Sequence, residues 1–517
     1  MSRLSRHRGR WVWGMLPALA LLIPAVGPID ADSGDAARRA EIRARRAARR
    51  EARTSPRPAA TPAPPLAVVD VSAAVDAAAT ALGGDGVAIA VCDRAGRPLA
   101  VFSRPLATPA ARDEALGLAR TGALFSNDQA PLSSRTVAYI SSHHFPPGIA
   151  NTAAGALFGI ENTNRGCDLN AAFLPGQDLP PATALGGGTG TGPVTRPGGV
   201  PLFLFDPATG TRRVVGGVGV SGAGSGTAAD AAHEYASFSA LLGGFAPDVP
   251  YPGAIYLDGI RLPFVTQRSL PAGFTAGSLA GAYDLGPLPG GPVPDGYLVG
   301  PAAGAMLTGA QVDAIVQAAV GRASATRAAI RLPLGSRTRM TIAVADLDGT
   351  ILGLYRMEDT TVFSVDVAVA KARNVVWFSS PARPASDLPG VPPGTAITNR
   401  TIGFGAQPFF PSGIDGTLPG PFRPLYLFDV SNPCTQGSQP ADPNQNGVVF
   451  FPGSAPLYVG GVLAGGLGVS GDGVEQDDFV TAAGASRYEP PASLRADQIV
   501  IGGVRLPYWK FPRNPTE

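Results

Sequence analysis

Histidine is the residue type in this chain best suited to ligate a metal, and it is scarce. The 517 residues include four histidines. His7 lies in an N-terminal segment that we expect to be removed, which leaves His143, His144 and His233. Because neutral imidazole is the commonest metal ligand in proteins, any histidine-ligated metal is predicted to use one of these three. All three lie in the first half of the chain.

Of these residues, His144 is predicted to be the metal ligand. Residues 137–142 alternate between apolar and polar, which favours a strand, and adjacent side chains of a strand point to opposite faces. Only one of His143 and His144 would then enter a given pocket, and His144 adjoins Phe145 and two prolines that offer an apolar wall. A surface or loop-packing role is the alternative. His233 is expected to be an ordinary helix residue.

The three cysteines are too few for a disulfide framework, and their spacing fits no zinc site. Cys92 lies in an apolar stretch typical of a buried strand, whereas Cys167 and Cys434 lie in polar loop sequence. In an oxidising compartment Cys167 and Cys434 are predicted to form a disulfide across the two halves, with Cys92 free; two free loop thiols are the alternative.

Glycine-rich and serine motifs suggest nucleotide binding or hydrolysis, but their context argues against both. Residues 217–222 (GVGVSG) spell a dinucleotide fingerprint, yet no acidic residue follows about 20 positions later. Ser221 and Ser470 lack the glycine two residues on that a nucleophile elbow needs. We interpret the glycines as allowing the strand to approach a neighbour closely. The helix start behind Ser221 and Ser470 could instead hold an anion.

Two sets of aspartates are expected to have local structural roles. Asp230, Asp477 and Asp478 stand where the last helix of each half should begin, and we interpret them as N-caps. Asp93 and Asp346 each stand in an Asp-x-x-Gly segment and are expected to stabilise a tight turn.

The elements that would position these residues come in two copies. Residues 87–102 (VAIAVCDRAGRPLAVF) match 340–355 (MTIAVADLDGTILGLY) at an offset of 253 residues. The motifs GGVGVSG (216–222) and GGLGVSG (465–471) follow in the same order. Shared motifs in a shared order indicate a tandem duplication, so we expect an internal pseudo-dimer.

Each copy reads as a helix, a strand–turn–strand unit, a second helix, a Gly/Pro-rich loop region, two more strands, a last helix and a closing strand. Hairpin connections imply antiparallel sheets with helices packed against them. We therefore predict an α+β fold with domains at 67–268 and 306–517, joined by a Gly/Pro linker at 269–305.

The second copy resembles the GlcG/HbpS-type family of haem-binding and haem-degrading domains. The resemblance rests on IAVADLDGTILGLYRM (342–357), DVAVAKAR (366–373) and GGLGVSG. It implies two profilin-like domains, each a five-stranded antiparallel sheet flanked by helices, and binding of haem or a related tetrapyrrole. The first copy departs from the pattern, with Ser103 at the arginine position and Leu118 at the lysine position.

Among the matching positions, Tyr355, Met357 and Lys371 are the candidate iron ligands of the second half. Arg356 belongs to the same set of cofactor-binding candidates. Met357 is expected to lie in the core, and Lys371 to pair with an acid or a propionate. The histidines favour a site in the first half over one in the second.

The charge of the chain is unevenly distributed. Residues 1–60 hold 13 of the 41 basic and 5 of the 39 acidic residues, which leaves a net negative body. Such a body is predicted not to bind nucleic acid. Residues 1–27 combine arginines with a short apolar run, which predicts a signal peptide and export to the periplasm or beyond; an uncleaved anchor or a cytosolic protein are the alternatives. Residues 28–66 form an Arg-rich, then Pro-rich tether that either contacts an anionic envelope surface or is merely solvated.

The leading hypothesis is an exported protein that binds haem or another tetrapyrrole. A haem-degrading or other redox enzyme at the same pocket is the first alternative, although no residue is assigned a catalytic role. The second alternative is a structural envelope protein without a ligand.

Overall fold

The structure is a computed structural model that describes residues 63–169, 192–249 and 255–516. The predicted signal peptide and nearly all of the predicted tether lie outside these residues. Within them, no helix is long and apolar enough to cross a membrane.

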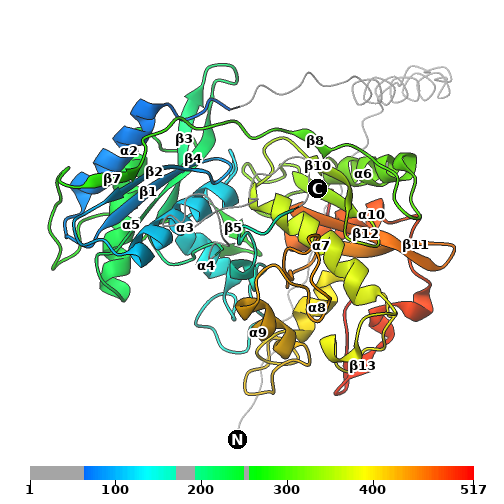
Figure 1. The fold of residues 1–517 in the computed structure, drawn as a ribbon. Helices are drawn as coiled ribbons and strands as arrows, with labels where there is room; N and C mark the ends of the chain where they lie inside the picture. Colours follow the sequence, from blue (N-terminus) through cyan, green and yellow to red (C-terminus); the bar gives the residue numbers. More distant parts are fainter. Residues whose placement is uncertain (1–62, 170–191, 250–254, 517) are drawn as a thin grey trace, which may run out of the picture. The chain divides into compact units, whose positions relative to one another are not determined.

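The first domain is built around a five-stranded antiparallel sheet of order β3-β4-β1-β2-β7. Helix α3 packs on one face, and α2 and α5 pack on the other (Figure 1). Its elements are α2 (Val68–Ala81), β1 (Ala88–Asp93), β2 (Pro98–Ser103), α3 (Pro109–Phe125), α4 (Ser134–Ser141), η1 (Ile160–Asn162), β3 (Gly199–Asp206), β4 (Thr211–Ser221), α5 (Thr227–Leu242), β5 (Tyr256–Leu257), β6 (Ile260–Arg261) and β7 (Ala282–Leu285).

The second domain repeats this plan with the strand order β11-β12-β9-β10-β8. Helix α7 covers one face, and α6 and α10 cover the other. Its elements are β8 (Gly296–Val299), α6 (Gly309–Ala323), β9 (Met340–Ala345), β10 (Ile351–Arg356), α7 (Phe363–Ser379), η3 (Ala385–Asp387), α8 (Asn399–Gly405), α9 (Arg423–Ser431), β11 (Ser454–Val459), β12 (Val462–Gly471), α10 (Val474–Gly484), η4 (Ala492–Leu494), η5 (Ala496–Gln498), β13 (Val500–Ile501) and β14 (Val504–Arg505). The predicted α+β fold of two tandem domains is confirmed.

Alternation along β12 explains how its two faces differ. Leu467 and Val469 point into a core shared with α6 and α10, whereas Gly466 and Gly468 face α7, where a Cβ on either glycine would lie 2.1 Å from a helix carbonyl oxygen. Side chains of a strand alternate between faces, so one face is filled by aliphatic groups and the other receives a helix at close range.

Two sequence-based expectations about secondary structure were wrong. Of the stretch expected to be extended at 137–142, residues 137–141 lie in α4, because Ser133 and Thr136 form a capping box that starts a helix. The expected linker 269–305 supplies the fifth strand of each sheet, since β7 pairs with β2 and β8 with β10. An edge strand needs hydrogen bonds on one side alone, so it tolerates the glycines and prolines around it. The closing strands of the two domains do not join the five-stranded sheets. They form separate hairpins of two-residue strands, β5 with β6 and β13 with β14.

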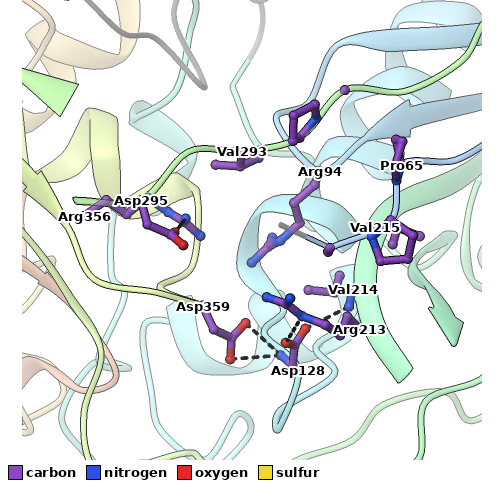
Figure 2. A pocket seen from close by; sticks show the side chains of 14 residues that line it. Pro65, Arg94, Asp128, Arg213, Val214, Val215, Val293, Asp295, Arg356 and Asp359 are labelled. Carbon is purple, nitrogen blue, oxygen red and sulfur yellow. Dashed lines mark hydrogen bonds and ion pairs between the residues drawn. The ribbon is translucent and has the colours of Figure 1, made fainter. Parts of the chain in front are cut away.

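The two domains share a hydrophobic core. Phe125 at the end of α3 stacks on Phe363 at the start of α7, with ring centroids 4.2 Å apart, and Val362 N–H donates to Leu124 O at 2.9 Å. Near them, Asp128 N–H donates to the Asp359 carboxylate (Figure 2). The predicted pseudo-dimer is therefore one packed unit.

Polar contacts at one edge of this interface are reciprocal. Asn151 N–H donates to Asp415 Oδ2 at 3.1 Å, and Asp415 N–H donates to Asn151 Oδ1 at 3.0 Å. Such an exchange is the pattern of an isologous contact, here made within one chain.

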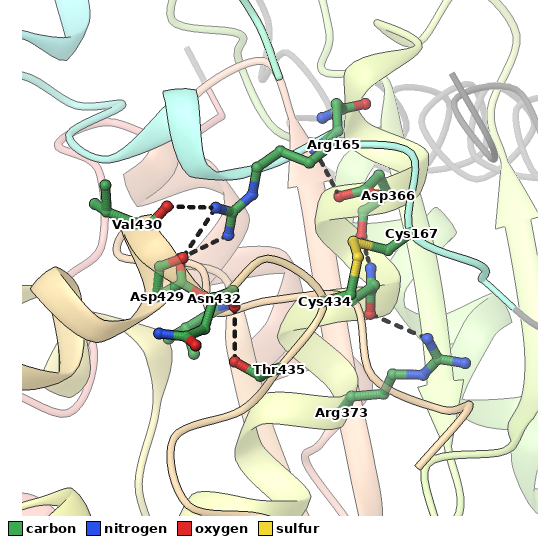
Figure 3. Close-up of a disulfide and its surroundings, with 12 residues drawn as sticks. Arg165, Cys167, Asp366, Arg373, Asp429, Val430, Asn432, Cys434 and Thr435 are labelled. Atoms are coloured by element: carbon green, nitrogen blue, oxygen red, sulfur yellow. Dashed lines mark hydrogen bonds and ion pairs between the residues drawn. A yellow bond between two sulfur atoms is a disulfide. The ribbon is translucent and has the colours of Figure 1, made fainter. Parts of the chain in front are cut away.

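A disulfide joins the loops of the two domains. Cys167 is bonded to Cys434, as predicted (Figure 3). Cys92 is free and buried. Beside the disulfide, Arg165 pairs with the buried Asp429 at 3.1 Å. Burial raises the pKa of Asp429 to about 7, and Arg165 opposes that rise.

Replacing Cys167 and Cys434 with serine is expected to lower the free energy of unfolding by about 2–4 kcal/mol, because the crosslink restricts the unfolded chain. Urea denaturation of the wild type with and without reductant provides the matched comparison. Identical unfolding curves for the oxidised and reduced proteins, or a mass spectrum showing three free thiols, would contradict this prediction.

Candidate functional site

An open cavity of about 570 Å³ lies at one end of the second domain. Three features meet there: the turn between β9 and β10, the hairpin between β11 and β12, and the C-terminal end of α7. Most of the side chains that line it are apolar or aromatic: Leu347, Val376, Trp377, Tyr458, Val462, Leu463 and Leu494. Val462 is 58% exposed and Leu347 39% exposed, so an apolar surface faces solvent here.

Polar groups around this cavity are held by the protein. Trp377 Nε1–H donates to Asp387 Oδ2 at 3.0 Å, which orients the indole ring. Arg373 donates from Nε to Gly349 O at 3.0 Å and from Nη2 to Leu169 O at 2.7 Å. Burial lowers the pKa of Arg373 to about 10, so its cation persists at neutral pH beside the apolar walls.

Tyr458 is the lining residue with the clearest capacity to ligate a metal. Among the residues that line the cavity, it is the one member of the set His, Cys, Met and Tyr, from which haem iron takes its protein ligands. Burial raises the pKa of its phenol to about 12. The phenol is therefore protonated at neutral pH.

Lys371 and Ser470 belong to a buried polar cluster and do not line the cavity. Lys371 Nζ lies 3.1 Å from Asp477 Oδ2, donates to Val469 O at 2.8 Å and sits 4.9 Å from the Phe451 ring centroid. Ser470 Oγ donates to a serine hydroxyl of α7 at 3.2 Å. Burial raises the pKa of Asp477 to about 7 and lowers that of Lys371, while their mutual attraction opposes both shifts.

The interpretation of Asp477 and Asp478 as N-caps was wrong. Gly473 is the N-cap of α10, and both acids lie inside the helix, where Asp477 pairs with the buried Lys371 and Asp478 with the half-buried Arg400. Asp478 Oδ2 lies 2.5 Å from Arg400 Nε. Asp230 likewise lies inside α5, behind the N-cap Gly226. Leaving these two cations without carboxylate partners would cost more free energy than leaving the helix with glycine as its N-cap.

The first domain keeps one of these ion pairs and has lost the other. Arg135 pairs with Glu234 at 2.5 Å, as Arg400 pairs with Asp478. A Cβ on Gly198 would meet Leu118 and His233, where a Cβ on Gly453 would meet Lys371 and Asp477. An apolar side chain and an imidazole thus replace the lysine and the aspartate.

His233 is accordingly a buried structural residue. Its Nε2 accepts a hydrogen bond from Ala223 N–H at 2.9 Å, and burial lowers its pKa to about 4. Ser221 nearby donates to the Glu114 carboxylate. His233 Nε2 and the Ser221 hydroxyl therefore both have hydrogen-bond partners within the first domain.

The candidates at the end of β10 are dispersed. Tyr355 packs edge-to-face on Tyr297, with centroids 5.0 Å apart, and Met357 lies in the core of the second domain, as predicted for it. Arg356 is buried, pairs with Asp295 at 2.6 Å and donates to Thr360 O. Burial lowers the pKa of Arg356, and Asp295 opposes that shift.

His143 and His144 lie on a loop between the domains. His144 Nδ1 is 3.1 Å from Thr152 O, Nε2 is 3.6 Å from Asp415 Oδ1, and its ring stacks on Phe409 at 6.0 Å. His143 lies 5.6 Å from the Phe158 ring centroid, and burial lowers its pKa. Ligation of iron by His144 stays a prediction. Within the described residues, no group of three or more His, Cys, Asp or Glu side chains could hold a metal ion.

Sequence reasoning missed the residues that line the cavity. Trp377 and Val462 carry no motif, and their role depends on three separate segments meeting at one end of the sheet. The duplication offered one usable signal: Trp377 aligns with Leu124 at the offset of 253 residues, so a large aromatic residue replaces an aliphatic one near the end of the matching helix.

Replacing Lys371 with leucine is expected to lower the free energy of unfolding by about 3–5 kcal/mol, because Asp477 would stay buried without its partner. The loss should be greater at about pH 8 than at about pH 5. Without Lys371, the pKa of Asp477 in the folded state rises further, because nothing opposes the effect of burial. The folded state then holds a proton that the unfolded chain releases. Stability therefore falls as pH rises.

The first domain supplies the matched control for this experiment. The double variant Lys371→Leu/Asp477→His copies Leu118 and His233 and is expected to recover most of the loss in urea denaturation. A single variant as stable as the wild type at both pH values would refute the role of the ion pair.

Comparison with known proteins supports the resemblance seen in the sequence. The family model described as haem degrading protein HbpS-like matches residues 67–236 and 307–486, together more than half of the chain. A crystal structure of a PduOC–haem complex covers 35% of this chain and 94% of its own, with 22% identity and a TM-score of 0.23. The Klebsiella pneumoniae protein ORFY covers 35% and 89%, with 19% identity and the same TM-score. No curated protein matches. The chain belongs to the HbpS-like family of haem-degrading proteins, as two tandem copies of its domain.

Proposed function

We propose that the protein binds haem or a related tetrapyrrole in the open cavity of the second domain. The observation that carries the proposal is the cavity of about 570 Å³ with mostly apolar walls, in a chain whose family is described as haem-degrading. Pockets for small organic ligands have volumes of roughly 300–1,000 Å³ and are lined mainly by apolar and aromatic side chains.

The residues present fit such a ligand. Trp377, Val462 and Leu463 offer apolar surface to a flat macrocycle. Arg373 contributes a buried positive charge beside the cavity, with its N–H groups bonded to the protein. Tyr458 offers a phenol oxygen to the iron. Haem would supply a redox-active iron centre, while these side chains bind and orient the ring. Since iron binding would displace the phenol proton, affinity through Tyr458 should increase as pH rises.

Haem degradation or another redox reaction at this cavity is the second candidate, and the family's description favours it. Supplying the haem-loaded protein with a reductant and oxygen separates the two functions. A stable Soret band supports a binding protein, and progressive loss of that band supports a degrading enzyme.

We also propose that the protein is exported. The disulfide between Cys167 and Cys434 favours an oxidising compartment, in agreement with the signal peptide predicted at residues 1–27. Sequencing the N-terminus of the protein from its native host is the test. A mature chain that begins near residue 28 supports export, and an intact N-terminus on a cytosolic protein contradicts it.

Leu347→Arg is expected to weaken haemin binding at least tenfold, because a charged side chain would enter the apolar cavity and the ligand would have to desolvate it. Absorbance titration of the Soret band measures the affinity. Leu427→Arg is the matched control: Leu427 is 54% exposed on α9 and does not line the cavity. Equal affinities for both variants would place the ligand elsewhere.

Tyr458→Phe is expected to shift the Soret band and remove the pH dependence of haemin affinity, while His144→Ala leaves both unchanged. Tyr458 lines the cavity, whereas His144 does not line it and packs between domain loops. The reverse result, with the band shifted by His144→Ala alone, would restore His144 as the ligand and refute the cavity as the site.

A further inference from the structure

The first domain has a counterpart of the cavity, at the corresponding end of its sheet. Arg94 comes directly after the turn residue Asp93, and Leu347 comes directly after the turn residue Asp346. The two positions correspond at the offset of 253 residues. Counting back from the shared GGxGVSG motif, Arg213 in β4 corresponds to Val462 in β12. The space at this end is about 40 Å³ (Figure 2), which is room for about one to three water molecules.

Arg94 fills the position that Leu347 leaves open. It is 6% exposed, its Nη2 donates to Ser126 O at 2.7 Å, and its Nη1 donates to Ala123 O. These carbonyl groups belong to the end of α3. A cation suits this end of a helix, where unpaired carbonyls and the helix dipole are negative.

Arg213 closes the same end from the other side. Its Nε lies 3.0 Å from Asp128 Oδ2, and Val214 N–H donates to the other oxygen of that carboxylate at 2.9 Å. Asp128 N–H donates to Asp359 of the second domain, and Arg331 pairs with Asp359 at 2.6 Å. A chain of polar contacts therefore runs from Arg213 through Asp128 and its N–H to Asp359 of the second domain (Figure 2). The two carboxylates in this chain repel each other, and each is paired with an arginine.

An apolar ligand could enter this end of the first domain only by separating these charges. Breaking a largely buried ion pair leaves a charge without its partner, and the guanidinium of Arg94 would also lose its carbonyl partners. The second domain has no such obstacle, since Leu347 and Val462 are uncharged and exposed.

We infer that the first domain's copy of the cavity is a charged junction between the domains, so each chain carries a single ligand site, in the second domain. Arg94 and Arg213 are the residues that exclude the ligand from the first domain. This inference rests on the proposed function for the identity of the ligand, but not for which of the two corresponding ends is open.

The test counts binding sites on the full-length chain with two probes, haemin and the apolar dye 1-anilinonaphthalene-8-sulfonate. The wild type is expected to bind one equivalent of each. The double variant Leu347→Arg/Val462→Arg, which copies the first domain into the second, should bind none. Two equivalents on the wild type, or one equivalent retained by this variant, would overturn the inference.

The reciprocal variant Arg94→Leu/Arg213→Val is expected to gain a second equivalent. Circular dichroism establishes whether it folds; if it does not, the Leu347→Arg/Val462→Arg variant decides. Absence of haemin binding to the wild type would refute the proposed function, and the dye stoichiometry would still test the single cavity. The two failures are therefore distinguishable.

Discussion

A close contact between one strand and one helix sets the geometry of each domain. A Cβ on Gly466 of β12 would lie 2.1 Å from Ala372 O, and one on Gly468 would lie 2.1 Å from Ala368 O. Any larger residue would push α7 away from the sheet. Gly217 and Gly219 of β4 make the same contact with α3. The depth at which the helix rests on the sheet then decides where its side chains and its C-terminal end lie.

The residues around this contact are where the two domains have diverged. On the flank of the helix, the buried pair Lys371–Asp477 of the second domain is replaced by Leu118 and His233 in the first. Both pairs of side chains fill the same buried position. The second domain places two opposite charges there, and the first domain places uncharged groups. Beyond the helix end, the second domain leaves an apolar cavity, while in the first domain Arg94 binds the helix carbonyls. After the duplication, both domains kept the close strand–helix contact, while the residues around it changed.

The predictions that succeeded were those in which local pattern and tertiary packing agree. The repeated motifs marked two copies of a strand–turn–strand unit, and Asp93 does form the turn expected of it, accepting hydrogen bonds from Ala95 N–H and Arg97 N–H at 2.9 Å. The glycines were interpreted as permitting a close approach, and the structure shows that α3 and α7 are the neighbours. The predictions failed where two local signals competed, as in α4, where the capping box at Ser133 prevailed over alternation.

The sequence by itself determined the duplication, the α+β class and the family, because these depend on the order and spacing of residues along the chain. Only the tertiary structure decided which residues face a common space. Tyr458, Trp377 and Leu347 are far apart in sequence and meet because a hairpin, a helix end and a turn converge at one end of a sheet. Likewise, Arg94 and Arg213 became part of a closed junction because Asp128, the partner of Arg213, donates its N–H to Asp359 of the other domain. Contacts of this kind depend on the depth and register of packing, which no local pattern encodes.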